Sequence, residues 1–420
     1  MPPGKTLTAL LKSATRPGHL LQLHALMLKS SHFPHHAFPT ARLLASPLAP
    51  LPYALSLFAA VPRPTLFHHT ALLRALSACP SAASLAASLS VLASARARVP
   101  ALDEFAFQPL LALCAKMPGD AEAASIGEQL HALVLRYGFL DVVSLRNVLC
   151  HFYCNCGSMV DARKVFEEMT ERDAISWNTL IGGYARAEDV HRAVEMFTAM
   201  RWSEMDVNVT AVITLIGCGW RGDSVHGFCV KAGLSSDVKV AAAMVRMYVR
   251  EGNVECSSKV FHETARRDLV LCNCMVDGYA KAGRIQDAMD LIDRMRQSGM
   301  RPSSGTLVGV LSACGSSGEL PAGRRIHELA EEAGLELDTT LGTALMDMYF
   351  KVHGNVKLGR MVQAQLDAMG HYHPSDVIQL SNTFASEGRW EEIARLRDLE
   401  EQKVSVENKE AGCSSIVVSC

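Results

Sequence analysis

The amino-acid sequence predicts an all-α protein in which helical hairpins stack into an α-solenoid. The first observation behind this prediction is a recurring tyrosine whose spacing resolves into units of roughly 31 and 35 residues, at Tyr153, Tyr184, Tyr248, Tyr279 and Tyr349. The second is that small and large apolar residues follow each tyrosine at fixed offsets that fit an α-helix. A single hairpin of this length cannot cover both of its apolar faces, so neighbouring units must stack to complete the core.

Each unit contains two helices, and the residues that define them recur in the same order. The tyrosine lies on the first helix, and a glycine four residues later is placed to end that helix in the left-handed conformation. That position holds Gly157, Gly252 and Gly283, with Glu188 as the exception. The second helix carries a mostly small residue where two helices approach, followed by a large apolar residue. These two positions hold Ala162, Ala193, Ser257, Ala288 and Leu358, then Phe166, Phe197, Phe261, Ile292 and Val362.

Extended along the chain, this register gives three kinds of unit. Long units are assigned to about 5–36, 104–142, 209–237 and 304–338, short units to about 37–65, 143–173, 238–268 and 339–369, and ordinary units to 66–103, 174–208 and 269–303. We expect a frayed second helix in the unit 209–237, because the region between its helices is shortened. The long units share a histidine, which we interpret as a packed core residue and not as a ligand; it recurs at His24, His131, His226 and His327.

Charge is distributed unevenly along the 420 residues. The chain has 41 basic and 43 acidic residues and is 49% hydrophobic, which excludes a disordered chain and a highly basic nucleic-acid tail. Nine basic residues precede the first acidic residue, Asp103. This acid-free start, rich in Ser and Ala, is typical of an organelle transit segment, although an ordinary basic first domain would share the composition. We predict a targeting segment at 1–36 that overlaps a degenerate first repeat, and we favour the mitochondrion, with the chloroplast as the alternative.

The 13 cysteines show no framework spacing, which indicates a reducing compartment and buried thiols. Two Cys-x-Cys pairs, Cys154 with Cys156 and Cys272 with Cys274, lie within first helices. Alternate helix residues point in different directions, so we expect no metal site and no cofactor. Two uncharged stretches near the N-terminus contain prolines, and we do not expect either to span a membrane.

Three stretches carry a family resemblance: Ala-Arg-Lys-Val-Phe-Glu-Glu-Met at 162–169, Ser-Trp-Asn-Thr-Leu-Ile-Gly-Gly-Tyr at 176–184 and Met-Val-Asp-Gly-Tyr-Ala-Lys-Ala-Gly at 275–283. With these motifs the chain resembles plant pentatricopeptide repeat (PPR) proteins of the PLS subclass, which mixes long and short repeats. The resemblance implies a right-handed α-solenoid superhelix of PPR repeats over 37–369.

The C-terminal part resembles the E-type extension that follows the repeats in editing-type members of this family. The stretches 380–390 and 412–416 carry this resemblance, and we assign an abbreviated extension to 370–420. A zinc deaminase needs His-x-Glu and Cys-x-x-Cys motifs, and the sequence has neither. The resemblance is therefore to members without the DYW deaminase domain, and we expect no enzyme activity and no catalytic residues.

The resemblance implies sequence-specific binding of single-stranded organellar RNA, with one base read per repeat. In this family the base-reading residues are the one after the aromatic position of the first helix and the last residue of the repeat. Carried over, Asn147 with Asp173 implies uridine, Asn178 with Asn208 cytidine or another pyrimidine, Asn273 with Ser303 a pyrimidine, and Thr70 with Asp103 guanosine. Such side chains offer hydrogen-bond donors and acceptors at fixed positions. Each asparagine could instead bond backbone groups at a turn or helix start.

The leading interpretation is a non-enzymatic site-recognition factor for C-to-U RNA editing. Its partners would be single-stranded organellar RNA and a deaminase recruited in trans through the C-terminal extension. One alternative is a factor for the stabilisation or splicing of an organellar transcript. Another is a scaffold similar to tetratricopeptide proteins, which would bind peptides in the same groove.

Overall fold

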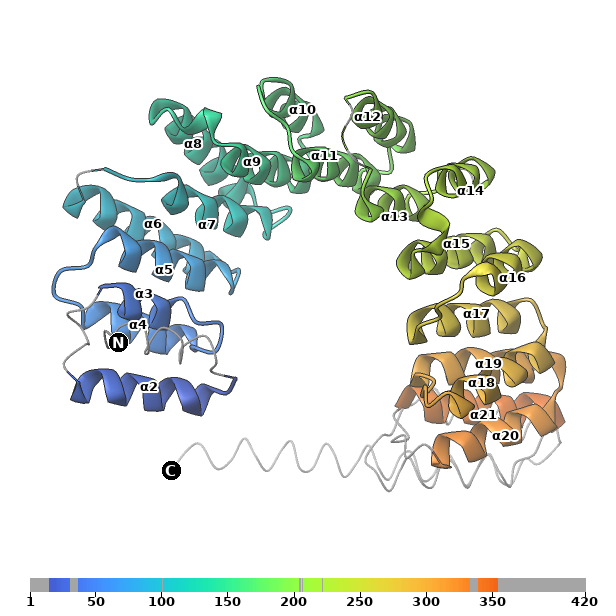
Figure 1. The fold of residues 1–420 in the computed structure, drawn as a ribbon. Helices are drawn as coiled ribbons and strands as arrows, with labels where there is room; N and C mark the ends of the chain where they lie inside the picture. Colours follow the sequence, from blue (N-terminus) through green and yellow to red (C-terminus); the bar gives the residue numbers. More distant parts are fainter. Residues whose placement is uncertain are drawn as a thin grey trace, which may run out of the picture. The chain divides into compact units, whose positions relative to one another are not determined.

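The computed structural model describes residues 15–30, 37–99, 101–203, 205, 207–220, 222–332 and 339–353. Over these ranges the protein is α-helical, with two short 3-10 turns and no strand. The prediction of an all-α solenoid built from helical hairpins is confirmed (Figure 1). The predicted C-terminal extension and most of the predicted targeting segment lie outside the described residues.

The chain divides into two compact units, of which the first is Met1–Trp220. Its helices are α2 (Pro17–Lys29), α3 (Ala37–Leu44), α4 (Leu51–Ala59), α5 (Leu66–Ser77), α6 (Ala82–Arg98), α7 (Glu104–Ala115), α8 (Ala121–Arg136), α9 (Val143–Asn155), α10 (Met159–Glu167), α11 (Ala174–Arg186), α12 (Val190–Trp202) and α13 (Val209–Gly217). A 3-10 turn, η1 (Phe139–Asp141), connects α8 to α9. From α3 onward the helices alternate between first and second helices of hairpins.

The second compact unit is Arg221–Cys420. Its helices are α14 (Gly222–Lys231), α15 (Val238–Arg250), α16 (Val254–Glu263), α17 (Leu269–Lys281), α18 (Ile285–Gln297), α19 (Ser304–Ser317), α20 (Leu320–Glu332) and α21 (Thr339–His353), with the 3-10 turn η2 (Leu234–Ser236) after α14. α15 with α16, α17 with α18, and α19 with α20 form three successive hairpins, and α21 begins the next repeat.

In each of the two compact units the first helices of successive hairpins pack directly on one another. The row runs through α3, α5, α7, α9, α11 and α13 in the first unit and through α15, α17, α19 and α21 in the second. In the first unit, α8, α10 and α12 lie together along one side of α7, α9 and α11 (Figure 1). Each unit therefore has a continuous layer of first helices, on which equivalent positions of successive repeats are neighbours.

The repeated apolar positions form the core of these stacks. All five register tyrosines are buried, and the small residues Ala162, Ala193, Ser257 and Ala288 are 0% exposed. The phenylalanine that follows on the second helix packs toward the next first helix: the rings of Phe166 and Trp177 are 4.8 Å apart and nearly perpendicular. Such edge-to-face contacts add to the hydrophobic gain from burial. Leu358 and Val362 lie outside the described residues.

The first helices end as the glycine pattern predicts. Gly157, Gly252 and Gly283 have φ angles of 81°, 74° and 71°, the left-handed region that glycine adopts at little cost. Glu188 adopts the same conformation with a φ of 58°, the one non-glycine residue with a positive φ in the described part of the chain. Packing of the hairpin therefore imposes this turn even where the side chain opposes it.

The histidines of the long units are half-buried, and each shares a hydrogen bond with a tyrosine of the next hairpin. The pairs, with their distances from Nδ1 to the hydroxyl oxygen, are His131–Tyr153 (2.8 Å), His226–Tyr248 (2.8 Å), His327–Tyr349 (2.9 Å) and His24–Tyr53 (2.7 Å). These histidines are packed residues, as interpreted from the sequence. Their packing is polar, however, and it joins each long unit to the unit that follows.

The expectation of a frayed second helix in the unit 209–237 is wrong. α14 runs for ten residues, and its Val225 and Cys229, one helical turn apart, are fully buried. Both helices of this unit are nevertheless short: α13 has nine residues where α7 and α19 have 12 and 14, and α14 has ten where α8 and α20 have 16 and 13.

Candidate functional site

The eight residues predicted to read bases occupy two equivalent places in the fold. Thr70, Asn147, Asn178 and Asn273 are each the fifth residue of a first helix, on α5, α9, α11 and α17. Asp103, Asp173, Asn208 and Ser303 are the N-cap residues of the next first helices, α7, α11, α13 and α19. Because successive first helices pack side by side, each pair lies on two adjacent helices.

Asn147 and Asp173 are brought into direct contact. Asn147 Nδ2 donates a hydrogen bond of 3.0 Å to Asp173 Oδ1, and Asn147 Oδ1 accepts one of 2.7 Å from the Ser176 hydroxyl. The Ser176 backbone N–H also donates to Asp173 Oδ1, at 2.8 Å, and so caps α11. Burial disfavours the ionised Asp173, but the bonds from Ser176 and Asn147 outweigh it and lower the pKa of this carboxyl.

This network commits most of the polar atoms of the pair. Asn147 is 6% exposed, while Asp173 is half-buried and its Oδ1 accepts the bonds from Asn147 Nδ2 and from the Ser176 N–H. The second carboxylate oxygen of Asp173 is the group of this pair that remains for a ligand.

The other two asparagines each have a buried acceptor without a partner. Oδ1 of Asn178 and Oδ1 of Asn273 are buried and have no hydrogen-bond partner among the described residues. A buried acceptor left in this state costs about 1–3 kcal/mol. Asn208 accepts a bond of 2.9 Å from the Ala211 N–H, and Ser303 Oγ accepts one of 3.3 Å from the Thr306 N–H. No hydrogen bond joins Asn178 to Asn208 or Asn273 to Ser303 in the described part of the chain.

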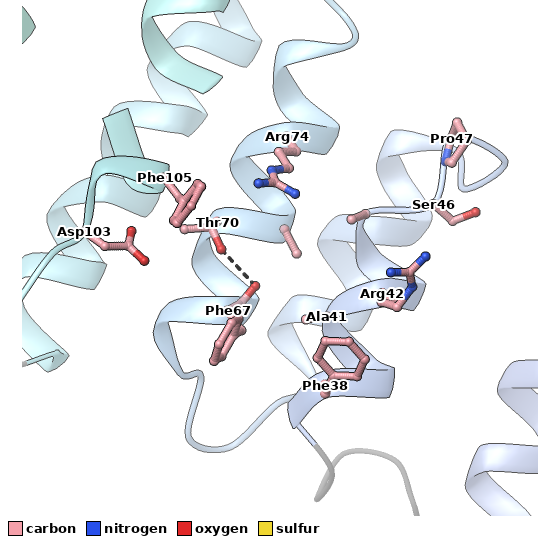
Figure 2. Close-up of a pocket in the computed structure, with 12 residues that line it drawn as sticks. Phe38, Ala41, Arg42, Ser46, Pro47, Phe67, Thr70, Arg74, Asp103 and Phe105 are labelled. Atoms are coloured by element: carbon pink, nitrogen blue, oxygen red, sulfur yellow. Dashed lines mark hydrogen bonds between the residues drawn. The ribbon is translucent and has the colours of Figure 1, made fainter. Parts of the chain in front are cut away.

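Thr70 and Asp103 line a common pocket of about 510 Å³ (Figure 2). Thr70 Oγ1 donates to the carbonyl oxygens of Leu66 and Phe67, at 3.1 and 3.2 Å, so its lone pairs remain available. Asp103 Oδ1 is buried without a hydrogen-bond partner in the described ranges. Burial, reinforced by the neighbouring charge of Glu104, raises the pKa of Asp103. A ligand that supplies N–H donors would favour the ionised form of this carboxyl group.

Sequence reasoning missed a row of exposed apolar side chains beside these positions. Five first helices, α3, α5, α7, α11 and α17, have an exposed apolar side chain at their second residue. These residues are Phe38, Phe67, Phe105, Ile175 and Val270, with exposed fractions of 55, 63, 45, 61 and 55%. Each lies three residues before the reading position, on the same helix face. Helical periodicity alone would class them as core, but their place at the exposed start of the helix could have identified them.

The described residues contain no group of three or more side chains arranged to hold a metal ion. They also contain no helix long and apolar enough to cross a membrane. The prediction of buried thiols holds for six cysteines of the described ranges, Cys150 and Cys154 among them, and is wrong for Cys79, which is exposed. Burial raises the pKa values of Cys150 and Cys154 to about 12 and about 11. These thiols are therefore poor nucleophiles at neutral pH.

Comparison with protein families identifies the repeats. Residues 147–173 and residues 171–201 each match a PPR repeat, and residues 267–316 match the PPR repeat family. Residues 353–417 match the E motif.

Related proteins come from plants. The chain is 36% identical over 350 residues to a mitochondrial pentatricopeptide repeat-containing protein of Arabidopsis thaliana, covering 81% of this chain and 60% of the relative. It is 30% identical over 356 residues to a chloroplastic one from the same plant, covering 75% of this chain and 47% of the relative. The chain thus spans about half to three fifths of the length of these two relatives.

Solved structures agree on the fold. The pentatricopeptide repeat protein PPR10, in complex with an 18-nt psaJ RNA element, matches with a TM-score of 0.68 and 17% identity, over 92% of this chain and 59% of that chain. A further relative is covered more completely: the mitochondrial protein OGR1 of Oryza sativa subsp. japonica is 31% identical over an alignment 428 positions long, which covers 90% of this chain and 72% of the relative. The repeats, the solenoid and this alignment together show that the chain belongs to the pentatricopeptide repeat family.

Proposed function

We propose that the protein binds single-stranded RNA in a sequence-specific manner, one base per repeat. The observation that carries this proposal is that the eight predicted residues recur at two fixed places, the fifth residue of a first helix and the N-cap of the next one. At three of these places a buried oxygen, on Asn178, Asn273 or Asp103, has no partner in the described part of the chain. Unstacked bases present N–H groups on their edges that would satisfy such oxygens. The RNA complex of PPR10, which shares this fold, also supports the proposal.

The chemistry of each pair suggests a base. The carboxylate of Asp103 suits the adjacent N–H donors of guanine, with the Thr70 hydroxyl beside it. Asn147 with Asp173 is proposed to prefer uridine, Asn178 with Asn208 a pyrimidine, and Asn273 with Ser303 a pyrimidine. The first three pairs lie in the first compact unit and, with the unassigned repeat between them, give the pattern G-n-U-Y.

The exposed apolar residues supply a second contribution to binding. Ile175 and Val270 lie one helical turn before Asn178 and Asn273, and Phe67 lies one turn before Thr70. A base held at the reading position would pack its face against this side chain. Such stacking is tolerant of sequence, so it adds affinity while the polar pair selects the base.

A binding experiment tests the base-reading role. Fluorescence anisotropy is measured with an RNA that carries G-n-U-Y and with one of the same composition in scrambled order. We expect the first RNA to bind roughly tenfold more tightly or better, because each correct base contact contributes about 1–3 kcal/mol. Equal binding to both RNAs, or binding to neither, would contradict the proposal.

A change of specificity makes the test sharper. Asn147→Thr places beside Asp173 the same pair of residues that Thr70 and Asp103 form, so the preferred third base should change from uridine to guanosine. Asn155→Thr is the matched control: Asn155 lies at the other end of α9, where its Nδ2 donates to the Ala115 carbonyl at 2.9 Å. The control should keep the preference for uridine.

We further propose that the bound RNA is a C-to-U editing target and that a deaminase is recruited in trans through the C-terminal extension, placed at 370–420. The match of residues 353–417 to the E motif supports this role over transcript stabilisation or splicing. Sequencing of organellar RNA from plants that lack the protein would show one or a few unedited cytidines. Unchanged editing with altered transcript abundance or splicing would favour the alternative, and bound peptide with no RNA effect would favour the scaffold.

We propose an organellar location, with the mitochondrion favoured and the chloroplast as the alternative. The acid-free N-terminal sequence supports an organelle, and the names of two of the relatives described above place those proteins in mitochondria. A fusion of residues 1–36 to a fluorescent protein would decide between the two organelles by colocalisation with markers of each. Signal that remains in the cytosol would contradict the targeting role of this segment.

A further inference from the structure

The pocket that contains Thr70 and Asp103 holds more than a base-reading pair. It is lined by α3, α5 and the beginning of α7, in three successive hairpins of the first unit (Figure 2). Two of its lining residues are arginines, Arg42 on α3 and Arg74 on α5. Both are exposed, and Figure 2 shows both guanidinium groups at this pocket.

Neither arginine is neutralised by the surrounding protein. In the described part of the chain neither guanidinium group forms an ion pair or a hydrogen bond; the one side-chain bond to these residues is from the Ser77 hydroxyl to the Arg74 backbone carbonyl. No acidic residue precedes Asp103 in the sequence, and Asp103 is the one carboxylate that lines the pocket. Two uncompensated guanidinium groups on adjacent helices make an anion site, and the planar fork of donors on each suits phosphate oxygens.

The rest of the pocket fits the remaining parts of a nucleotide. Phe38, Phe67 and Phe105 line it, and each ring is about half exposed, with fractions of 55, 63 and 45%. Three aromatic rings together occur at this place and at no other first-helix start in the described residues. The second residue of the other first helices is Ser144, Ile175, Thr210, Lys239, Val270, Gly305 or Thr340. A volume of about 510 Å³ falls in the range of sites that hold a small ligand.

We propose that Arg42 and Arg74 form a phosphate seat, so that this pocket holds a whole guanosine nucleotide of the RNA and not its base alone. This inference rests on the proposed function, because the guanine would be read by Thr70 and Asp103. The seat anchors the RNA at one end of the helix row and thereby fixes the register in which the following repeats meet the U-Y part of the target.

Charge-removing variants test the seat. Arg42→Gln and Arg74→Gln should each weaken binding of the G-n-U-Y RNA by about tenfold, the effect of losing a hydrogen bond to a charged group. Arg74→Lys keeps the charge without the fork and should weaken binding less. Arg96→Gln removes the same charge from the exposed face of α6 and is the matched control. It should leave the affinity almost unchanged.

The salt dependence shows whether the lost contact is to phosphate. Each neutralised phosphate of a single strand contributes about −0.7 to the slope of log affinity against log salt. The double variant Arg42→Gln/Arg74→Gln should have a slope that is shallower by about this amount. An RNA with a neutral methylphosphonate at the guanosine should show the same loss with the wild-type protein and no further loss with the double variant.

The phosphate could be the 5′-terminal group of the RNA or an internal phosphodiester, and two RNAs distinguish them. If the terminal group is bound, a 5′-phosphate on the guanosine raises the affinity of the wild-type protein and not that of the double variant. If an internal linkage is bound, a leader of three nucleotides before the guanosine gives the same gain, and a phosphate at the end of that leader adds nothing.

The outcomes separate this proposal from the one on which it rests. One outcome is that the protein discriminates G-n-U-Y RNA from scrambled RNA while both arginine variants bind like Arg96→Gln. This result would overturn the phosphate seat and leave base reading intact. Equal binding of both RNAs with a strong dependence on Arg42 and Arg74 would overturn base reading and support the seat. A protein that binds none of the RNAs overturns both.

Discussion

Glu188 occupies a backbone conformation that suits glycine, with a φ of 58°. The left-handed conformation costs a residue with a Cβ atom roughly 1–2 kcal/mol. Glu188→Gly should therefore raise the free energy of unfolding by about 0.5–1 kcal/mol, since relief of the strain exceeds the entropy that glycine loses on folding. Thermal unfolding followed by circular dichroism measures this as a higher Tm.

The matched control for Glu188 is the equivalent position of another repeat. Gly157 has a φ of 81°, and a Cβ atom added there would meet no atom within 4 Å. Gly157→Ala should therefore lower the Tm through backbone strain alone. A Glu188→Gly protein that melts no higher than the wild type would show that the turn is not strained.

The repeat register in the sequence located the candidate base-reading residues, but it did not show which hydrogen bonds these side chains form. Asn147 and Asp173 were predicted as partners from their spacing, and they do meet, at 3.0 Å. The bond from Ser176 to Asn147 depends on how α9 and α11 stack, which no local pattern contains. The half-exposed Phe67 was missed because an apolar residue on an amphipathic helix is indistinguishable from core until its neighbours are known.

At the scale of the helix, stacking of first helices depends on glycines that directly precede the tyrosines. A Cβ atom at Gly278 on α17 would lie 2.5 Å from Cγ2 of Val249 on α15, and one at Gly183 on α11 would lie 2.4 Å from Sγ of Cys154 on α9. These distances are shorter than van der Waals contact, so the helices approach to the limit that glycine permits. The same Gly-Tyr dipeptide occurs at both places.

We expect Gly278→Ala to destabilise the protein by about 1–3 kcal/mol, because Val249 or the helix must move to admit the methyl group. Gly227→Ala is the control on the exposed face of α14, where an added Cβ atom meets nothing within 4 Å. That change should be neutral or stabilise the protein by up to about 1 kcal/mol, as expected from helix propensity. If both variants shift the Tm in the same direction, the close approach of α15 and α17 is not a constraint.

The order and type of the elements were predictable, whereas their lengths were not in every case. The tyrosine and its offsets define both helices of each hairpin because burial of one stripe per helix needs those positions. The nine-residue α13 could not be foreseen, since Gly217, Cys218 and Gly219 are compatible with either a shortened first helix or a frayed second one. The buried Val225 and Cys229 show that the second helix is packed and not frayed.

For the molecule as a whole, buried histidines make stability depend on pH. Burial is the largest cause that lowers the pKa of His131, helped by the charge of Arg146, and it outweighs the opposing charges of Glu168 and Asp161. Burial also lowers the pKa of three other histidines, His24 on α2 and His68 and His69 on α5. Above the ordinary histidine pKa of about 6.5, folded and unfolded chains are both neutral at these sites. Below it the unfolded chain binds protons that the folded chain does not bind. The free energy of unfolding therefore decreases as the pH is lowered.

His131→Gln tests this dependence. We expect the wild-type Tm to fall between pH 7.5 and pH 5.5. The Tm of the variant should fall less over the same interval, because one imidazole with a lowered pKa has been removed. Tyr153→Phe removes the hydroxyl and keeps the titrating group, so its Tm should be lower at both pH values and should still fall on acidification. An equal loss of Tm in wild type and His131→Gln would mean that His131 does not contribute.

The histidine and tyrosine pairs also bear on how such an array changes through evolution. Three of the four pairs have the same sequence separation, 22 residues, and each crosses the border between one repeat and the next. Deleting the long repeat at that border would leave the buried tyrosine of the short repeat next to a repeat that lacks this histidine, at the cost of an unmade hydrogen bond. Gene duplications and losses that keep a long repeat together with the short one after it preserve the bond. The inherited block is therefore larger than the single hairpin, and an ancestor that gained or lost target bases would be expected to do so several at a time.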